Sequence, residues 1–425
     1  MFLVVINGIS SYSIYLQGTV SYAKGYSGAF MFVRPCVRFC LSGMTSRLSG
    51  VAFALCICLL MQDTPRYLQA KPISVLVGEA NGRQETIPQL EYLNEPFAVD
   101  FDTAGVMYVV EFLRGNRVMR SRQPIQSTTI SSDLLPFSGV FHRATAKSKK
   151  SNTVNTQAGS SAEVRYLGMH DLAIGRKGEI YLADTFNHCI RVLNPETGTV
   201  TTLAGTGKAS FSGDGGVASG AEFNQPYCCS LSPDKKRLLI ADIRNQRLRS
   251  IDLGSEIITT LAGDGTRGKT IEGADPKESP LAGPRAACEA SDGTTYLVLR
   301  EGNALVSIKS GALRTVVNLS GKKGYGGDNG PAAAAVLSGP KYVCMDQRQR
   351  VLIVDTENHC VRCFDPKTER ISLVAGVPTE AGSTVGDSWT TTHLRRPHGV
   401  RMAPDGRLII VDSENDRILI GPAPE

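Results

Sequence analysis

Short runs of apolar residues recur along the chain, each ending in an acidic residue with asparagine following about three positions later. The copies end, in chain order, at Glu111, Asp184, Asp242, Arg300, Asp355 and Asp412, the first being irregular and the fourth carrying Arg instead of Asp. From Asp184 onward the copies are separated by 58, 58, 55 and 57 residues. A nearly constant period of this size indicates a repeat architecture, in which each copy is one supersecondary unit.

Each copy contains several segments of β-strand character. A first apolar run follows an opening residue, and the opening residues are Pro96, Met169, Pro226, Pro284, Pro340 and Pro397. A turn, the run that ends in the acidic residue, a third run and a fourth run such as 201–205 follow. Runs rich in β-branched residues and bounded by Gly, Asp and Asn predict strands joined by hairpins. Six copies therefore predict an all-β, six-bladed β-propeller of four-stranded antiparallel blades.

The two ends of the repeat region complement each other. The sixth copy stops after its third strand, near Ile420, whereas Ile73–Val77 resembles a fourth strand that has no blade of its own. Pairing the two would close the ring and cover an exposed sheet edge. We therefore expect the propeller to span residues 72–421, closed by its N-terminal strand.

The first copy is longer than the others. From Pro96 to Met169 the chain runs 73 residues, and the surplus falls in 121–165, a segment rich in Ser, Thr and Lys. Such a composition predicts an insertion on one rim of the propeller.

The N-terminal region has the pattern of a targeting signal. Arg47 precedes an apolar run of 14 residues at 48–61, too short for a typical membrane span but suitable for a signal-peptide core. Residues 44–70 are therefore predicted to be a signal peptide or an uncleaved N-terminal anchor, and residues 1–43 an extension outside the native protein. We expect an exported protein, periplasmic or extracellular, with a membrane tether if the segment is retained.

The net charge of +6 is concentrated in 1–70 and 121–165, which leaves the rest of the chain close to neutral. Nucleic-acid binding normally requires an extended basic surface, so we expect no nucleic-acid partner. We also expect a monomer.

The repeated polar residues have a structural interpretation. Asp and Asn side chains cap tight turns, and their recurrence in nearly every copy favours that role over a ring of calcium ligands. His188 and His359 follow the Asn in two copies and fall under the same argument. Cys360 and Cys363 lie at an odd offset in one predicted strand, which points them to opposite faces and predicts buried thiols.

The residue after each opening residue does not repeat, which makes it the better functional candidate. These residues are Phe97, His170, Tyr227, Arg285, Lys341 and His398. They begin the innermost strands and should surround one mouth of the central channel. His170, Tyr227, Arg285, Lys341 and His398 are the candidate ligand-binding residues, forming an anion pocket or part of a metal site.

Two segments resemble the NHL repeat. They are 184–191 and 355–362, which share Asp-Thr-x-Asn-His-Cys-(Ile/Val)-Arg. The linkers that contain 211–218 and 324–333 are similar to those of exported bacterial NHL-repeat proteins and of the NHL portion of teneurins. The resemblance covers about residues 72–421 and implies the propeller fold. It implies no single function, because the family includes lyases, RNA-binding modules, sensor domains and adhesion domains.

Two functional hypotheses follow. The first is a non-catalytic scaffold without a cofactor that binds an unidentified protein or a small anionic ligand through its channel face. The alternative is a metal-dependent lyase or lactone hydrolase with zinc or calcium in the channel, similar to peptidyl-hydroxyglycine lyases or gluconolactonases. His170 and His398 are the two histidines at this level, whereas catalytic zinc usually has three protein ligands. This favours the scaffold.

Overall fold

The computed structural model describes residues 73–78, 93–125, 134–140 and 159–424. The chain divides into two compact units, 1–69 and 70–425, and all described residues belong to the second. The segments predicted as an extension (1–43) and as a signal or anchor (44–70) lie outside the described residues. Within the described ranges, no helix has the length and apolar character required to cross a bilayer.

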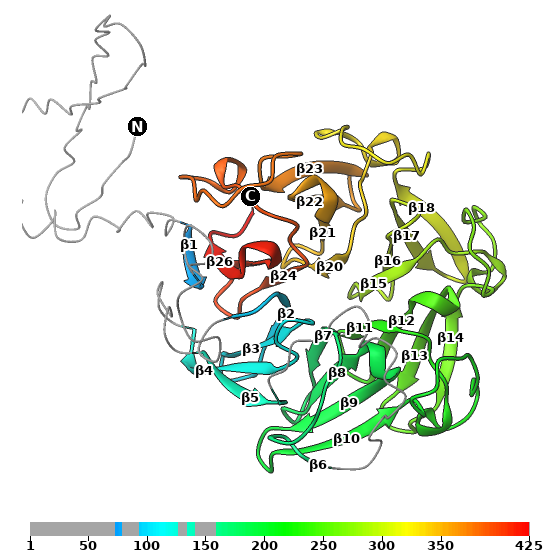
Figure 1. Ribbon diagram of the computed structural model, residues 1–425. Coiled ribbons are helices and arrows are strands. Elements are labelled where there is room, and N and C mark those ends of the chain that lie inside the picture. The colour runs from blue at the N-terminus through cyan, green and yellow to red at the C-terminus, as the bar shows by residue number, and fades with distance from the viewer. Residues whose placement is uncertain (1–72, 79–92, 126–133, 141–158, 425) are drawn as a thin grey trace, which may run out of the picture. The chain divides into compact units, whose positions relative to one another are not determined.

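Six antiparallel sheets form a six-bladed propeller, and each sheet is one blade (Figure 1). Blade 1 contains β2 (Pro96–Phe101), β3 (Val106–Glu111), β4 (Val118–Pro124) and β5 (Leu134–Ser138). Blade 2 contains β7 (Met169–Ile174), β8 (Ile180–Asp184), β9 (Cys189–Asn194), β10 (Thr199–Ala204) and a short β6 (Gly159–Ser160). Blade 3 contains β11 (Pro226–Leu231), β12 (Arg237–Asp242), β13 (Arg247–Asp252) and β14 (Ile258–Ala262).

Blade 4 contains β15 (Pro284–Glu289), β16 (Thr295–Leu299), β17 (Ala304–Lys309) and β18 (Ala312–Val317). Blade 5 contains β20 (Tyr342–Met345), β21 (Val351–Asp355), β22 (Cys360–Asp365), β23 (Arg370–Ala375) and a short β19 (Gly330–Pro331). Blade 6 contains β24 (Gly399–Met402), β25 (Leu408–Asp412), β26 (Arg417–Gly421) and β1 (Ser74–Val77).

Short 3-10 turns connect some of these strands. They are η2 (Thr185–Asn187), η3 (Ala218–Gly220), η4 (Ile243–Asn245), η5 (Pro276–Glu278), η6 (Ala332–Ala334), η7 (Thr356–Asn358), η8 (Trp389–Thr391) and η9 (Ser413–Asn415). η2, η4, η7 and η9 form the corner between the second and third strands of their blades.

The six-bladed fold predicted from the period is confirmed. In five blades the second strand ends at the acidic residue of the repeat, and in blade 4 it ends at Leu299, one residue before Arg300. The blades are not all four-stranded as predicted, because β6 adds to β10 and β19 adds to β23. The thiols of Cys360 and Cys363 are both buried in β22, as expected.

The predicted ring closure is also confirmed. β1 pairs antiparallel with β26, with Ser74 opposite Ile420, and completes blade 6. Leu76 is fully buried in this contact. Part of the 121–165 segment belongs to the blades, because it contains the end of β4, all of β5 and β6. The remaining candidates for the predicted insertion are residues 126–133 and 141–158, which lie outside the described residues.

The acidic residue at the end of the second strand fixes the start of the innermost strand in the same blade. Its carboxylate accepts a backbone N–H two positions before the opening residue, at 2.7 to 2.8 Å. The pairs are Glu111 with Asn94, Asp184 with Leu167, Asp242 with Asn224, Asp355 with Ser338 and Asp412 with Arg395. All five carboxylates are completely buried. The second oxygen of each Asp accepts from the side-chain amide of the repeat Asn, which confirms a structural role.

A second set of hydrogen bonds joins each blade to the next. Six residues at the corners have left-handed backbone conformations and accept, through a side-chain atom, the N–H just before the next blade's opening residue. We call them the corner acceptors: Asn116, His188, Gln246, Asn303, His359 and Asp416. Asp416 accepts from Glu95 N–H and so links blade 6 to blade 1 at 2.7 Å. His188 and His359 are thus structural, as predicted, but their acceptor role between blades was not foreseen.

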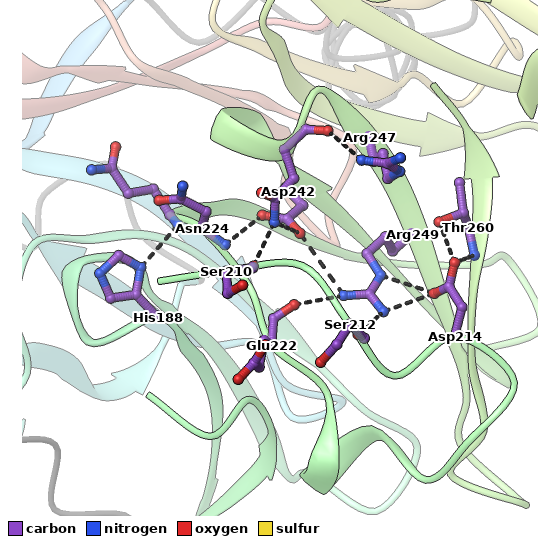
Figure 2. Close-up of polar contacts among 12 residues, drawn as sticks. His188, Ser210, Ser212, Asp214, Glu222, Asn224, Asp242, Arg247, Arg249 and Thr260 are labelled. Atoms are coloured by element: carbon purple, nitrogen blue, oxygen red, sulfur yellow. Dashed lines mark hydrogen bonds and ion pairs between the residues drawn. The ribbon is translucent and has the colours of Figure 1, made fainter. Parts of the chain in front are cut away.

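The aspartates of the Gly-rich linkers bind buried arginines. Figure 2 shows Arg249, which is fully buried, directed at Asp214 with two nitrogen–oxygen distances of 3.2 and 2.7 Å. Asp214 also accepts from the Thr260 hydroxyl at 2.6 Å. Arg362 and Asp328 repeat the arrangement in blade 5, at 3.0 and 2.7 Å. These linkers therefore fasten the outer part of a blade.

The corner acceptors predict a clear difference between two substitutions of His359. In His359→Ala the N–H of Arg396 loses its acceptor. We expect the free energy of unfolding to fall by about 2 kcal/mol, the cost of leaving that N–H without a partner. His359→Asn should lose less than about 1 kcal/mol, because Asn accepts hydrogen bonds and tolerates this conformation. Urea unfolding measures both, and equal losses would contradict the role.

Candidate ligand-binding site at the channel mouth

The six candidate residues lie where the innermost strands begin. Phe97, His170, Tyr227 and Arg285 are the second residues of β2, β7, β11 and β15, and Lys341 and His398 directly precede β20 and β24. The strand pairing of the first four blades shifts register at these residues, as at a β-bulge. A bulge removes one residue from the regular ladder and redirects its side chain. In β2, β11 and β15 the residue that the shift leaves unpaired is the candidate residue, and in β7 it is His170 together with Asp171.

The structure brings all six side chains together, and we call them the mouth ring. The Phe97 ring stacks on His398 with centroids 4.0 Å apart and meets His170 edge-on at 5.2 Å. The His170 and Tyr227 rings have centroids 3.9 Å apart, and the Arg285 guanidinium carbon lies over the Tyr227 ring, 4.2 Å from its centroid. Lys341 Nζ lies 3.2 Å from His398 Nε2. Tyr227 is half-buried and the other five are buried. Ligand binding itself stays a prediction.

The hydrogen bonds of the two imidazoles define their protonation. In each ring Nδ1 lies against a backbone carbonyl, Gly168 O at 2.9 Å for His170 and Arg396 O at 2.8 Å for His398. A carbonyl only accepts, so Nδ1 carries the proton in both. Burial, followed by nearby cations, lowers the pKa of both histidines well below the usual value. Both are therefore neutral at pH 7, and Nε2 is an acceptor in each.

Lys341 is a buried amine with a partner on either side. Its Nζ lies 3.0 Å from Glu357 Oε1 and donates to His398 Nε2. Burial lowers the pKa of Lys341 to about 7, although Glu357 counteracts part of that effect. Burial alone would raise the pKa of Glu357, but hydrogen bonds from Arg396 and Lys341 lower it to about 2. Glu357 is thus ionised and shared between two cations.

Arg285 differs from the other buried arginines of the propeller. It is 5% exposed, yet in the described part of the chain its guanidinium has neither a carboxylate nor a hydrogen-bond acceptor as partner. Its contact is the face of Tyr227. Burial lowers the pKa of Arg285 to about 10, so the side chain remains charged at pH 7. Arg285 therefore places a largely desolvated positive charge on this side of the mouth ring.

The geometry does not favour a shared metal ion between the two histidines of the ring. The Phe97 ring contacts both imidazoles, and the Nε2 atom of His398 is already an acceptor for Lys341. Over residues 73–424, as far as they are described, no group of three or more His, Cys, Asp or Glu side chains is arranged to hold a metal.

The other end of the channel holds a cavity that the sequence reasoning missed. It measures about 360 Å³ and is lined by the ends of the innermost strands of all six blades. Asp100 and Arg401 form an ion pair there at 2.7 Å, and Glu289 pairs with Arg237 at 2.8 Å. Asp100 and Arg401 each lie four positions after the opening residue of their blade. Aligning the six copies at that position would have placed both residues at the same end of the channel.

Lys341 generates a pH prediction. A base whose pKa falls to about 7 on folding, from about 10.4 in the unfolded chain, binds fewer protons when folded. Its contribution to stability therefore increases as pH rises between these values, by up to about 1.4 kcal/mol per pH unit. We expect the free energy of unfolding of wild type, relative to Lys341→Met, to rise from pH 7 to pH 9. In urea titrations the exposed control Lys309→Met retains Lys341 and should follow wild type between pH 7 and pH 9. A rise in Lys341→Met as steep as that of Lys309→Met would contradict the assignment.

Comparison with known proteins agrees with this architecture. The NHL repeat model matches residues 337–364 and 394–420, in blades 5 and 6. NHL repeat-containing protein 2 of Gallus gallus is 26% identical over 294 residues, which cover 62% of this chain and 40% of that protein. Protein SUPPRESSOR OF QUENCHING 1, chloroplastic, of Arabidopsis thaliana is 25% identical over 255 residues, which cover 57% and 24%. The chain thus spans two fifths or less of these curated relatives.

Solved structures show the same fold at low sequence identity. An auxiliary nutrient binding protein from Bacteroides ovatus superposes with a TM-score of 0.55 at 12% identity, covering 83% of this chain and 76% of that one. A protein of unknown function from Bacteroides thetaiotaomicron gives 0.57 at 12% identity, with 83% and 75% covered. The chain is therefore a six-bladed β-propeller that carries NHL repeats in blades 5 and 6 and is similar to NHL repeat-containing proteins.

Proposed function

We propose that this propeller is a non-catalytic binding scaffold that holds an anionic group of a small ligand at its mouth ring. Arg285 supplies the positive charge, and the Lys341 amine, which is about half protonated at pH 7, lies in the same ring. The aromatic rings of Phe97 and Tyr227 form the apolar part of the same surface. Sites of this kind combine a mostly apolar lining with a few polar groups that orient the ligand.

The observation that carries the proposal is the absence of an anionic partner for Arg285 among the described residues. Removing a charged guanidinium from water costs several kcal/mol unless a counter-charge or acceptor replaces the water. Other buried arginines of the propeller have such partners, for example Arg249 with Asp214 and Arg417 with Asp412. A bound carboxylate or phosphate would supply for Arg285 what those aspartates supply within the fold.

Two further features support binding at this place. The residue types of the mouth ring differ from blade to blade, whereas the acidic residue that ends the second strand recurs in five of the six blades. The fold therefore does not require the same residue type at each mouth-ring position. One structure of similar fold is described as an auxiliary nutrient binding protein, which is consistent with a binding role for such a propeller.

The proposal predicts which arginine governs anion binding. Wild type should bind acetate and inorganic phosphate saturably, as measured by backbone amide chemical shifts or calorimetry. Arg285→Gln removes the charge and should weaken binding about 10- to 100-fold, the loss expected for a charged hydrogen bond. Arg267→Gln is the matched control, because Arg267 is exposed in the linker before blade 4.

Equal weakening in the Arg285 and Arg267 variants would indicate a non-specific charge effect and contradict the proposal. So would the lack of saturable binding in wild type.

A further inference from the structure

We infer that the ligand of the mouth ring is a small hydroxycarboxylate, whose carboxylate pairs with Arg285 while its hydroxyl donates a hydrogen bond to Nε2 of His170. This inference rests on the proposed function and adds the chemical class of the ligand. It starts from a difference between the two histidines of the ring.

His170 and His398 have the same protonation but different partners. Nδ1 of each donates to a backbone carbonyl, and Nδ1 of His170 also lies 2.8 Å from the Thr185 hydroxyl. Nε2 of His398 is occupied, since it accepts from Lys341 at 3.2 Å. Nε2 of His170 has no hydrogen-bond partner in the described part of the chain. His170 therefore presents an unused acceptor on a side chain that is 5% exposed.

The unused acceptor and the unpartnered cation belong to side chains that contact the same tyrosine ring. His170 and Arg285 both contact the ring of Tyr227, at 3.9 Å from the imidazole centroid and 4.2 Å from the guanidinium carbon. The imidazole centroid and the guanidinium carbon are therefore no more than about 8 Å apart, a distance that one small molecule beside the ring can span. Each side chain is 5% exposed, so such a molecule can approach both from the channel mouth.

The charge of the site favours a hydroxyl over an ammonium group as the donor. Burial is the main cause that lowers the pKa of His170, and the charges of Arg285 and Lys341 lower it further. Nε2 of His170 therefore stays unprotonated and can accept a hydrogen bond. An ammonium group on the ligand would add a second positive charge beside Arg285 on this desolvated surface, where like charges repel strongly. A neutral O–H donates the same hydrogen bond without that penalty. Hydroxy acids thus fit the site better than amino acids of the same size.

The test compares three probes of similar size on the full chain at pH 7.5: glycolate, acetate and glycine. Wild type should bind glycolate about five-fold more tightly than acetate, the gain expected for one neutral hydrogen bond. Glycine should bind more weakly than acetate. His170→Asn retains a donor for Gly168 O but lacks the acceptor at the Nε2 position, so the glycolate-to-acetate ratio should fall to about one. Arg267→Gln should retain the wild-type ratio.

Equal affinities of wild type for glycolate and acetate would overturn this inference and leave the anion site itself standing. A preference for glycolate that persists in His170→Asn would also overturn it. If no probe binds to wild type, the proposed function fails instead. Should His170→Asn not fold, as judged by its thermal transition, the ratio measured on wild type decides alone.

Discussion

The hydrogen bond that each corner acceptor receives from the next blade is the interaction on which the rest of this structure depends. Its donor is the backbone N–H of the residue directly before that blade's opening residue. The N–H one position earlier donates to the carboxylate at the end of the same blade's second strand. Two adjacent backbone groups are thereby held just before each innermost strand, except in blade 4, where Arg300 replaces the Asp. The residue after the opening position must then face the channel. Asp416 closes the cycle by holding Glu95, beside the pairing of β1 with β26.

The period and its alignment made much of this predictable. Because the register of each blade follows from the acidic residue, the blades, the closing strand and all six mouth-ring positions could be read from spacing alone. The ion pairs between blades could not, because they join residue types that the repeat does not share from one blade to the next. The sharing of Glu357 between Lys341 and Arg396 is one example, and the Asp100–Arg401 pair at the opposite mouth is another. The protonation of His170 likewise required the position of a carbonyl.

Electrostatics separates the structural cations of the propeller from the functional candidate. Arg117, Arg249 and Arg417 are at most 1% exposed, and each has a carboxylate within 2.7 Å. These pairs fasten corners and linkers, so their cost of desolvation is offset within the fold. Arg285 is buried nearly as deeply, but among the residues that the structure describes its partner is the aromatic face of Tyr227. The same reasoning that assigns the paired arginines to the fold assigns this one to a ligand.

The most direct test of the account is the location of a bound anion. Selenate is a tetrahedral oxyanion whose selenium is visible by anomalous scattering in a crystal. The account predicts an anomalous peak about 4 Å from Cζ of Arg285, the separation expected for a charge-assisted hydrogen bond between guanidinium and oxyanion. The peak should be absent in Arg285→Gln crystals grown under the same conditions. Peaks confined to exposed lysines and arginines, with the mouth ring empty, would contradict the central claim.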